Sequence, residues 1–133
     1  MAMYLLDTNI CVALLNSNRK VKQRFSREFP QCYTSALVIA ELYKGAYASQ
    51  QVERNLENVR SFSELLTVEG FDRTAAEEFG KIQAELRLLA RPTGVMDSLI
   101  AAVARSRGSI VVTHNIRDFE NIPGLRLEDW IAQ

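Results

Sequence analysis

The chain has 133 residues, with 16 basic and 16 acidic side chains and a formal net charge of zero, so any nucleic-acid partner must be bound by local basic patches rather than by a generally basic surface. Its length suits one domain with a real core, and its apolar fraction of 47% and charged fraction of 24% are those of an ordinary globular protein. The sequence shows no secretion signal and no apolar run near the roughly 20 residues of a membrane span, so we expect a cytoplasmic protein that does not enter a membrane.

Short apolar runs alternate with longer helical patterns along the chain. Strands are predicted at residues 3–6, 32–34, 66–68, 110–113 and 125–127, and helices at residues 9–16, 21–29, 36–48, 51–65, 74–89 and 97–106. Thr8 or Asn9 is suited to cap the first helix, and Ser35 is suited to cap the third. This alternation predicts right-handed crossovers and an α/β fold with a mainly parallel central sheet covered on both faces.

Three acidic residues occur in apolar surroundings. Asp7 ends the first strand, Glu41 lies within the third helix, and Asp97 begins the last helix. Buried carboxylates cost free energy unless a cation compensates them, so a shared divalent metal would explain all three. One histidine and two cysteines cannot build an ordinary zinc site, and oxygen ligands favour Mg²⁺ or Mn²⁺.

Each of these acids also has an ordinary structural interpretation. Asp7 is suited to cap the helix that follows it. Glu41 could pair with Lys44 on the helix surface, and Asp97 would be favoured in a first helical turn by the helix dipole. Cys11 and Cys32 are expected to be core residues in a reducing cytosol, although a bridge between them stays open.

The segment after strand 110–113 supplies further polar groups at the same edge of the sheet. Thr113 offers a hydroxyl, Asn115 an amide and Asp118 a carboxylate, although such residues are also common in turns. His114 is interpreted as a loop residue. Converging carboxylates repel one another when ionised, and this repulsion would raise their pKa values. A divalent cation would offset the repulsion and could activate a water molecule for attack on a phosphodiester.

Four segments of the chain resemble the PIN-domain ribonucleases, and within that family the VapC toxins of bacterial toxin–antitoxin pairs. They are residues 4–9, 35–42, 92–102 and 112–119, in that order, and residues 123–125 and 128–130 also fit. Because the resemblance runs from the first strand to the last residues, it implies a single PIN domain over residues 1–133 with a PIN-like α/β/α sandwich fold.

The resemblance also implies an activity and a site. VapC toxins of type II systems are endoribonucleases that depend on Mg²⁺ or Mn²⁺ and cleave structured RNA such as tRNA by a metal-activated water. The resemblance assigns the catalytic and metal-binding roles to Asp7, Glu41, Asp97 and Asp118, with supporting roles for Thr8, Asn9, Thr113 and Asn115. Many PIN domains carry an aspartate where this chain has Asn115, and its close relatives carry an acid at the position of Asp118.

The partners implied by the resemblance are an RNA substrate, a cognate VapB-type antitoxin that wraps the toxin and blocks its site, and a second copy of the chain in a homodimer. Arg91 and Arg117 are the first candidates for RNA contacts, because they flank the predicted acidic loops. Two alternatives remain: an inactive PIN-like domain that binds RNA or protein, favoured by Asn115, and a phosphotransfer domain with Asp7 as nucleophile. The second usually needs another aspartate where Asn9 stands.

Overall fold

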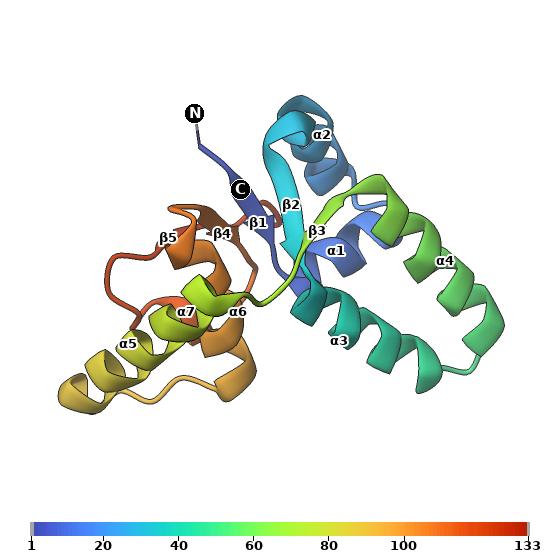
Figure 1. Ribbon diagram of the computed structural model, residues 1–133. Coiled ribbons are helices and arrows are strands. Elements are labelled where there is room, and N and C mark those ends of the chain that lie inside the picture. Colours follow the sequence, from blue (N-terminus) through green and yellow to red (C-terminus); the bar gives the residue numbers. More distant parts are fainter. Residues whose placement is uncertain (1, 133) are drawn as a thin grey trace.

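A computed structural model describes residues 2–132, in which five parallel strands form one central sheet (Figure 1). The strands are β1 (Tyr4–Leu6), β2 (Cys32–Ser35), β3 (Thr67–Glu69), β4 (Ile110–Val112) and β5 (Arg126–Glu128). Their order across the sheet is β3-β2-β1-β4-β5, and every neighbouring pair is parallel. The predicted α/β class with a mainly parallel sheet is therefore confirmed.

Helices lie on both sides of this sheet (Figure 1). They are α1 (Thr8–Leu15), α2 (Arg19–Glu28), α3 (Ala36–Tyr47), α4 (Val52–Leu65), α5 (Arg73–Leu89), α6 (Val95–Ser106) and α7 (Ile116–Phe119), with a 3-10 turn at Phe29–Gln31. In Figure 1, α1, α3 and α4 lie to one side of the strands, and α5, α6 and α7 to the other. Right-handed crossovers require this division, because the chain runs outward through β2 and β3 and then returns to β4.

Local sequence explains most element boundaries. The central strands are apolar on both faces, as parallel strands covered by helices must be, and Leu5, Leu6 and Val111 are fully buried. The Ser35 hydroxyl accepts a hydrogen bond from the Leu37 backbone NH at 3.0 Å, which confirms the predicted cap of α3. The predicted caps of α1 are wrong, since the helix begins one residue earlier and leaves Asp7 in the N-cap position.

One predicted loop contains a helix. Residues 116–119 form the single turn α7, where the polar sequence favoured an irregular loop. Phe119 at its end is fully buried, so burial of that ring outweighs the turn preference of the residues before it. At the other ends the differences are one or two residues; α6, for example, begins at Val95 rather than Asp97.

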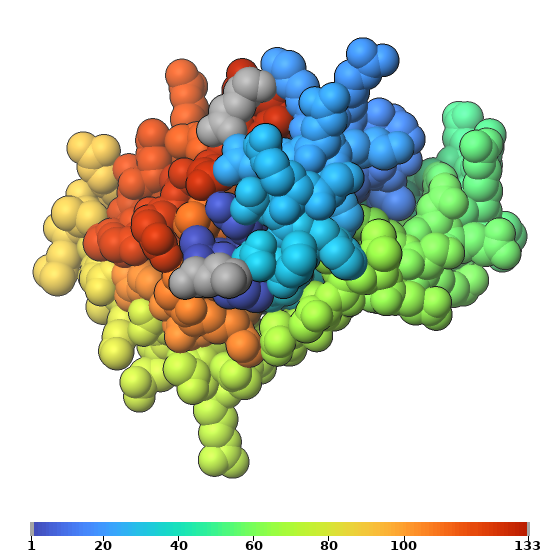
Figure 2. All heavy atoms as spheres, turned by 90° about the horizontal axis from the view of Figure 1, so that it is seen from above, coloured from blue at the N-terminus to red at the C-terminus, as the bar shows by residue number. Residues whose placement is uncertain are grey.

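The C-terminal segment packs against the first strand and α2. The Trp130 side chain is almost fully buried, and its ring meets the Tyr4 ring edge-on at 5.4 Å. The Arg24 guanidinium lies 5.1 Å from the Trp130 ring centroid and pairs with Glu128 at 2.9 Å. Figure 2 shows the blue atoms of α2 beside this red segment. Residues beyond β5 therefore belong to the same core.

Two further expectations bear on the core and the membrane. Cys11 and Cys32 are both buried and free, as favoured from the sequence. Of the helices in residues 2–132, none combines the length and apolar character that a membrane span requires.

Candidate active site

Asp7 and Thr113 lie side by side where the strand order reverses. Asp7 follows β1 and Thr113 follows β4, and these two strands pair although about 100 residues separate them. The Asp7 backbone NH donates to the Val112 carbonyl at 2.9 Å, which extends the ladder to the carboxyl edge. In open parallel sheets, ligands bind in the crevice at this switch point.

The Asp7 carboxylate faces its neighbours rather than the helix it precedes. It is only 4% exposed, and its Oδ2 accepts hydrogen bonds from the Thr113 hydroxyl at 2.8 Å and the Asn9 amide at 3.4 Å. Asp7 occupies the N-cap position of α1, as its ordinary structural interpretation predicts, but its side chain makes no capping hydrogen bond to the helix. Burial raises the pKa of Asp7, as do the charges of Glu41 and Asp118, against hydrogen bonds from Thr113 and the Thr8 backbone.

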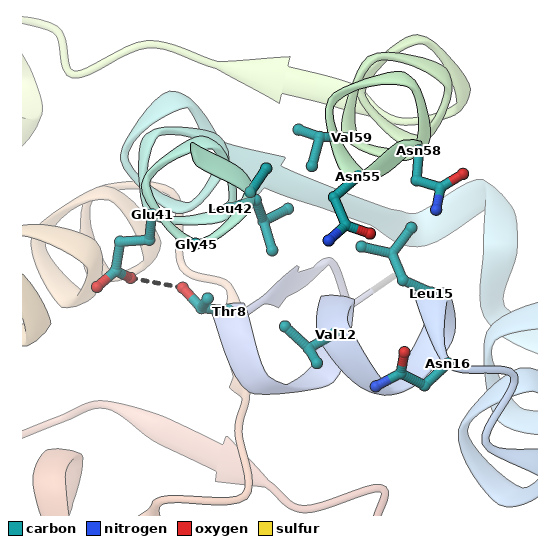
Figure 3. Close-up of a pocket in the computed structure, with 11 residues that line it drawn as sticks. Thr8, Val12, Leu15, Asn16, Glu41, Leu42, Gly45, Asn55, Asn58 and Val59 are labelled. Carbon is teal, nitrogen blue, oxygen red and sulfur yellow. Dashed lines mark hydrogen bonds between the residues drawn. The ribbon is translucent and has the colours of Figure 1, made fainter. Parts of the chain in front are cut away.

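Glu41 reaches the same region from α3. Its carboxylate accepts a hydrogen bond from the Thr8 hydroxyl at the start of α1 (Figure 3). Glu41 is half-buried and forms no ion pair with Lys44 in the described structure, so the alternative of a surface pair does not hold.

Asp97 enters from the first turn of α6 and is half-buried. Burial and, after it, the negative charges of Asp7, Asp118 and Glu41 in that order together raise its pKa to about 6. The four acids predicted from the sequence are therefore close enough to interact electrostatically, although they come from four different elements.

Asp118 and Asn115 complete the site from the β4 side. Asp118 is exposed on α7, and its charge raises the pKa of both Asp7 and Asp97. Asn115 is also exposed; its backbone NH donates to the Thr113 hydroxyl at 3.0 Å. On this side of the site the charge that acts on Asp7 and Asp97 is that of Asp118, whereas Asn115 carries an uncharged amide.

The donor set of this edge suits a hard divalent cation. Among residues 2–132, none of the four acids has a basic partner within ion-pair distance, so their mutual repulsion is uncompensated. Carboxylates and hydroxyls are the ligands that Mg²⁺ and Mn²⁺ prefer. No three of the described His, Cys, Asp and Glu side chains are already close enough to ligate one ion together, so direct coordination by three acids requires side-chain rotation.

Sequence reasoning did not anticipate the hydrogen bonds that organise this edge. The Asn9 amide donates to Thr113 Oγ1 at 3.3 Å, and its oxygen accepts from the His114 backbone NH at 2.9 Å. The Asn9 side chain therefore joins the ends of β1 and β4. It has this structural role at the position where a phosphotransfer domain would need a second aspartate. No spacing rule in the sequence indicates this bridge, because it depends on the pairing of two distant strands.

The two arginines proposed as RNA contacts are both exposed. Arg91 lies beyond α5 and donates to the Asn121 side chain at 3.4 Å, while Arg117 lies on α7 beside Asp118. The Asn121 contact brings Arg91 close to the segment that follows α7. Neither arginine forms an ion pair with an acid of the described chain.

A groove of about 390 Å³ leads away from the acidic edge between α1, α3 and α4 (Figure 3). Thr8 and Glu41 lie at one end of it. Apolar side chains and amides line the rest: Val12, Leu15, Leu42, Val59, Asn16, Asn55 and Asn58. The groove is therefore mainly apolar, with an acid at its inner end.

Comparison with known proteins agrees with this geometry. Residues 4–125 match the family described as PIN domain. The chain is 43% identical to the tRNA(fMet)-specific endonuclease VapC of Shigella flexneri over 131 residues, covering 98% of this chain and 99% of that protein. It is 37% identical to Ribonuclease VapC2 of Haemophilus influenzae over 132 residues, covering 98% and 100% respectively.

The same likeness holds in three dimensions. A chain in the crystal structure of DNA-bound VapBC from Salmonella typhimurium superposes with a TM-score of 0.92 and 40% identity. The superposition covers 98% of this chain and 99% of that one. A chain of VapBC2 from Rickettsia felis, bound to a promoter DNA fragment, superposes with a TM-score of 0.90 and 30% identity, covering 96% and 98%.

Proposed function

This chain belongs to the PIN-domain family and is a toxin endoribonuclease of the VapC group, and from that premise we propose that it cleaves structured RNA such as tRNA at the acidic edge, with Mg²⁺ or Mn²⁺ bound there. Asp7, Glu41, Asp97 and Asp118 are the proposed ligands. The observation that carries the proposal is the convergence of these four uncompensated acids at the switch point of the sheet.

The chain's own residues hold this site in place. Thr113 and Asn9 fix the Asp7 carboxylate, and Thr8 fixes that of Glu41. A divalent ion would supply the positive charge that stabilises charge developing on the phosphodiester and would make water more acidic. Without it, the Asp97 carboxyl retains a proton below about pH 6. All four acids are present, so nothing favours an inactive binding domain.

Two features support the proposed boundaries and location. We propose that residues 1–133 form one PIN domain, since β5 and Trp130 extend the core past the residues that match the family. Because the proposed substrate is intracellular RNA, we expect the protein to act in the cytoplasm.

The groove between α1, α3 and α4 supports a cognate VapB-type antitoxin as partner. Its apolar lining fits the apolar face of an amphipathic helix, and a basic side chain of that helix could reach Glu41 and cover the site. The exposed apolar residues Leu88, Leu89, Val95 and Met96 near the α5–α6 connection support a homodimer in which a second copy covers them.

The substrate and metal are tested by incubating the purified chain with total tRNA and with an unstructured RNA of similar length. We expect discrete tRNA fragments with Mg²⁺ or Mn²⁺, none with EDTA, and recovery when metal is restored. Equal cleavage of both RNAs would contradict the preference for structured RNA, and undiminished cleavage in EDTA would contradict the metal.

A further inference from the structure

His114 is the one histidine of the chain, and the structure gives it fixed contacts beside the acidic edge. It directly follows Thr113, and its backbone NH donates to Asn9, the residue that also holds Asp7. Its ring nitrogen Nδ1 lies 3.0 Å from Oδ2 of Asp129. The His114 backbone therefore belongs to the hydrogen-bond network that holds Asp7, and its ring is held by Asp129.

Asp129 is itself held in place. Its Oδ1 accepts hydrogen bonds from the backbone NH groups of Ile131 at 2.9 Å and Ala132 at 3.1 Å. Burial raises the pKa of Asp129, but these hydrogen bonds and the contact with His114 outweigh it and hold the pKa below its ordinary value. A carboxylate that stays ionised and immobile fixes both the orientation and the Nδ1 proton of the imidazole.

The other ring nitrogen is free. The His114 side chain is 51% exposed, and its Nε2 has no hydrogen-bond partner among residues 2–132. At this edge the four acid side chains offer only acceptors when ionised, and they repel the phosphates of an RNA. Because Nδ1 faces Asp129, the exposed Nε2 is the ring nitrogen that remains available to an RNA.

We propose that His114 is an RNA-contacting residue, whose Nε2 forms a hydrogen bond with a nucleotide that flanks the cleaved bond, and that Asp129 is its positioning residue. This inference rests on the proposed function. The competing explanation is a latch, in which the His114–Asp129 contact only ties the end of β4 to the C-terminal segment.

Two substitutions separate these explanations, because each amide replaces a different ring nitrogen. His114→Asn places its amide near Nδ1 and can keep the Asp129 contact, whereas His114→Gln reaches the position of Nε2. For an RNA contact, His114→Asn should raise KM about tenfold with kcat within about twofold, and His114→Gln should stay within about threefold of wild type in KM. Asp129→Asn should raise KM in the same direction by a smaller factor.

A latch predicts the opposite pattern. His114→Gln would then lower Tm while KM stays unchanged, and His114→Asn would match wild type in both. That result would overturn the proposal.

Because there is one histidine, its ring gives a single set of imidazole NMR signals, which can be followed directly. Titration of the full chain with tRNA in EDTA, where cleavage is prevented, should shift the His114 ring signals in proportion to RNA bound. Ring signals that stay unmoved while backbone amide signals report saturated binding would overturn this inference alone. A chain that neither binds nor cleaves RNA would overturn the proposed function and this inference with it.

Discussion

Replacing Asp97 by asparagine should make the metal-free protein more stable while removing its activity. The pKa of Asp97 rises from an ordinary value of 3.8 to about 6, first because of burial and then because of Asp7, Asp118 and Glu41. The ionised Asp97 carboxylate thus lowers the free energy of unfolding of the chain. Asparagine has nearly the same shape and carries no charge, so it removes the penalty without opening a cavity.

The magnitude follows from the two pKa values. At 1.36 kcal/mol for each tenfold change in proton affinity, the difference corresponds to about 3 kcal/mol. Solvent screens a half-exposed carboxylate, and the first turn of α6 favours a negative charge by about 0.3–1 kcal/mol. We therefore expect Asp97→Asn to raise the free energy of unfolding by about 1–2 kcal/mol above pH 6.

The pH dependence has a definite sign. A folded-state pKa above the unfolded value means that the penalty is absent below about pH 4, grows between about pH 4 and pH 6, and is complete above that. Urea unfolding in EDTA at pH 4.5 and pH 7.5 measures it, with Glu64→Gln on the exposed surface of α4 as a control that should change stability by less than about 0.5 kcal/mol.

Added Mg²⁺ should narrow the gap between wild type and Asp97→Asn, because a bound cation compensates the carboxylate. If Asp97→Asn is no more stable than wild type at pH 7.5 in EDTA, or if its advantage is as large at pH 4.5, then the acids do not destabilise the fold as argued.

Three further predictions concern the scaffold. Ser35→Ala should lower the free energy of urea unfolding by about 1 kcal/mol because α3 loses its cap; an unchanged value would show that the cap is dispensable. Burial raises the pKa of the Cys11 thiol far above its ordinary value and that of Cys32 to about 12, so neither should react with a thiol reagent at pH 8 until urea unfolds the chain. Arg105→Ala should cost about 2 kcal/mol, since the arginine is 14% exposed and pairs with Glu78 at 2.7 Å and Glu85 at 2.6 Å; a smaller loss than about 0.5 kcal/mol in the same assay would contradict that importance.

Most of the fold could be predicted because its elements follow local patterns. The run Tyr4–Leu6 and the β-branched Ile110–Val112 become the central strands, since apolar runs of that length suit a sheet buried on both faces. The turn α7 was missed because its stability depends on burying Phe119, a tertiary contact that the polar residues before it do not reveal.

The acids of the site could be identified one by one, but their neighbours could not. Asp7 is a candidate because it is a carboxylate that follows an apolar strand, and Asp97 is a candidate because it is an acid that precedes an apolar helical segment. Whether Asp7 meets Thr113 depends on β1 pairing with β4 rather than with another strand, and local propensity does not determine that pairing. The Asn9 bridge and the contact between His114 and Asp129 also depend on which strands pair, so the sequence alone does not reveal them.

The most direct test of the central claim compares tRNA cleavage by wild type, Asp7→Asn and Glu64→Gln at equal protein concentration, each with Mg²⁺ and with EDTA. If the four acids form the catalytic edge, wild type and Glu64→Gln should cleave only with Mg²⁺, and Asp7→Asn should lose at least about a hundredfold in kcat/KM while keeping a cooperative unfolding transition. Full activity of a folded Asp7→Asn protein, or cleavage by all three in EDTA, would contradict the account.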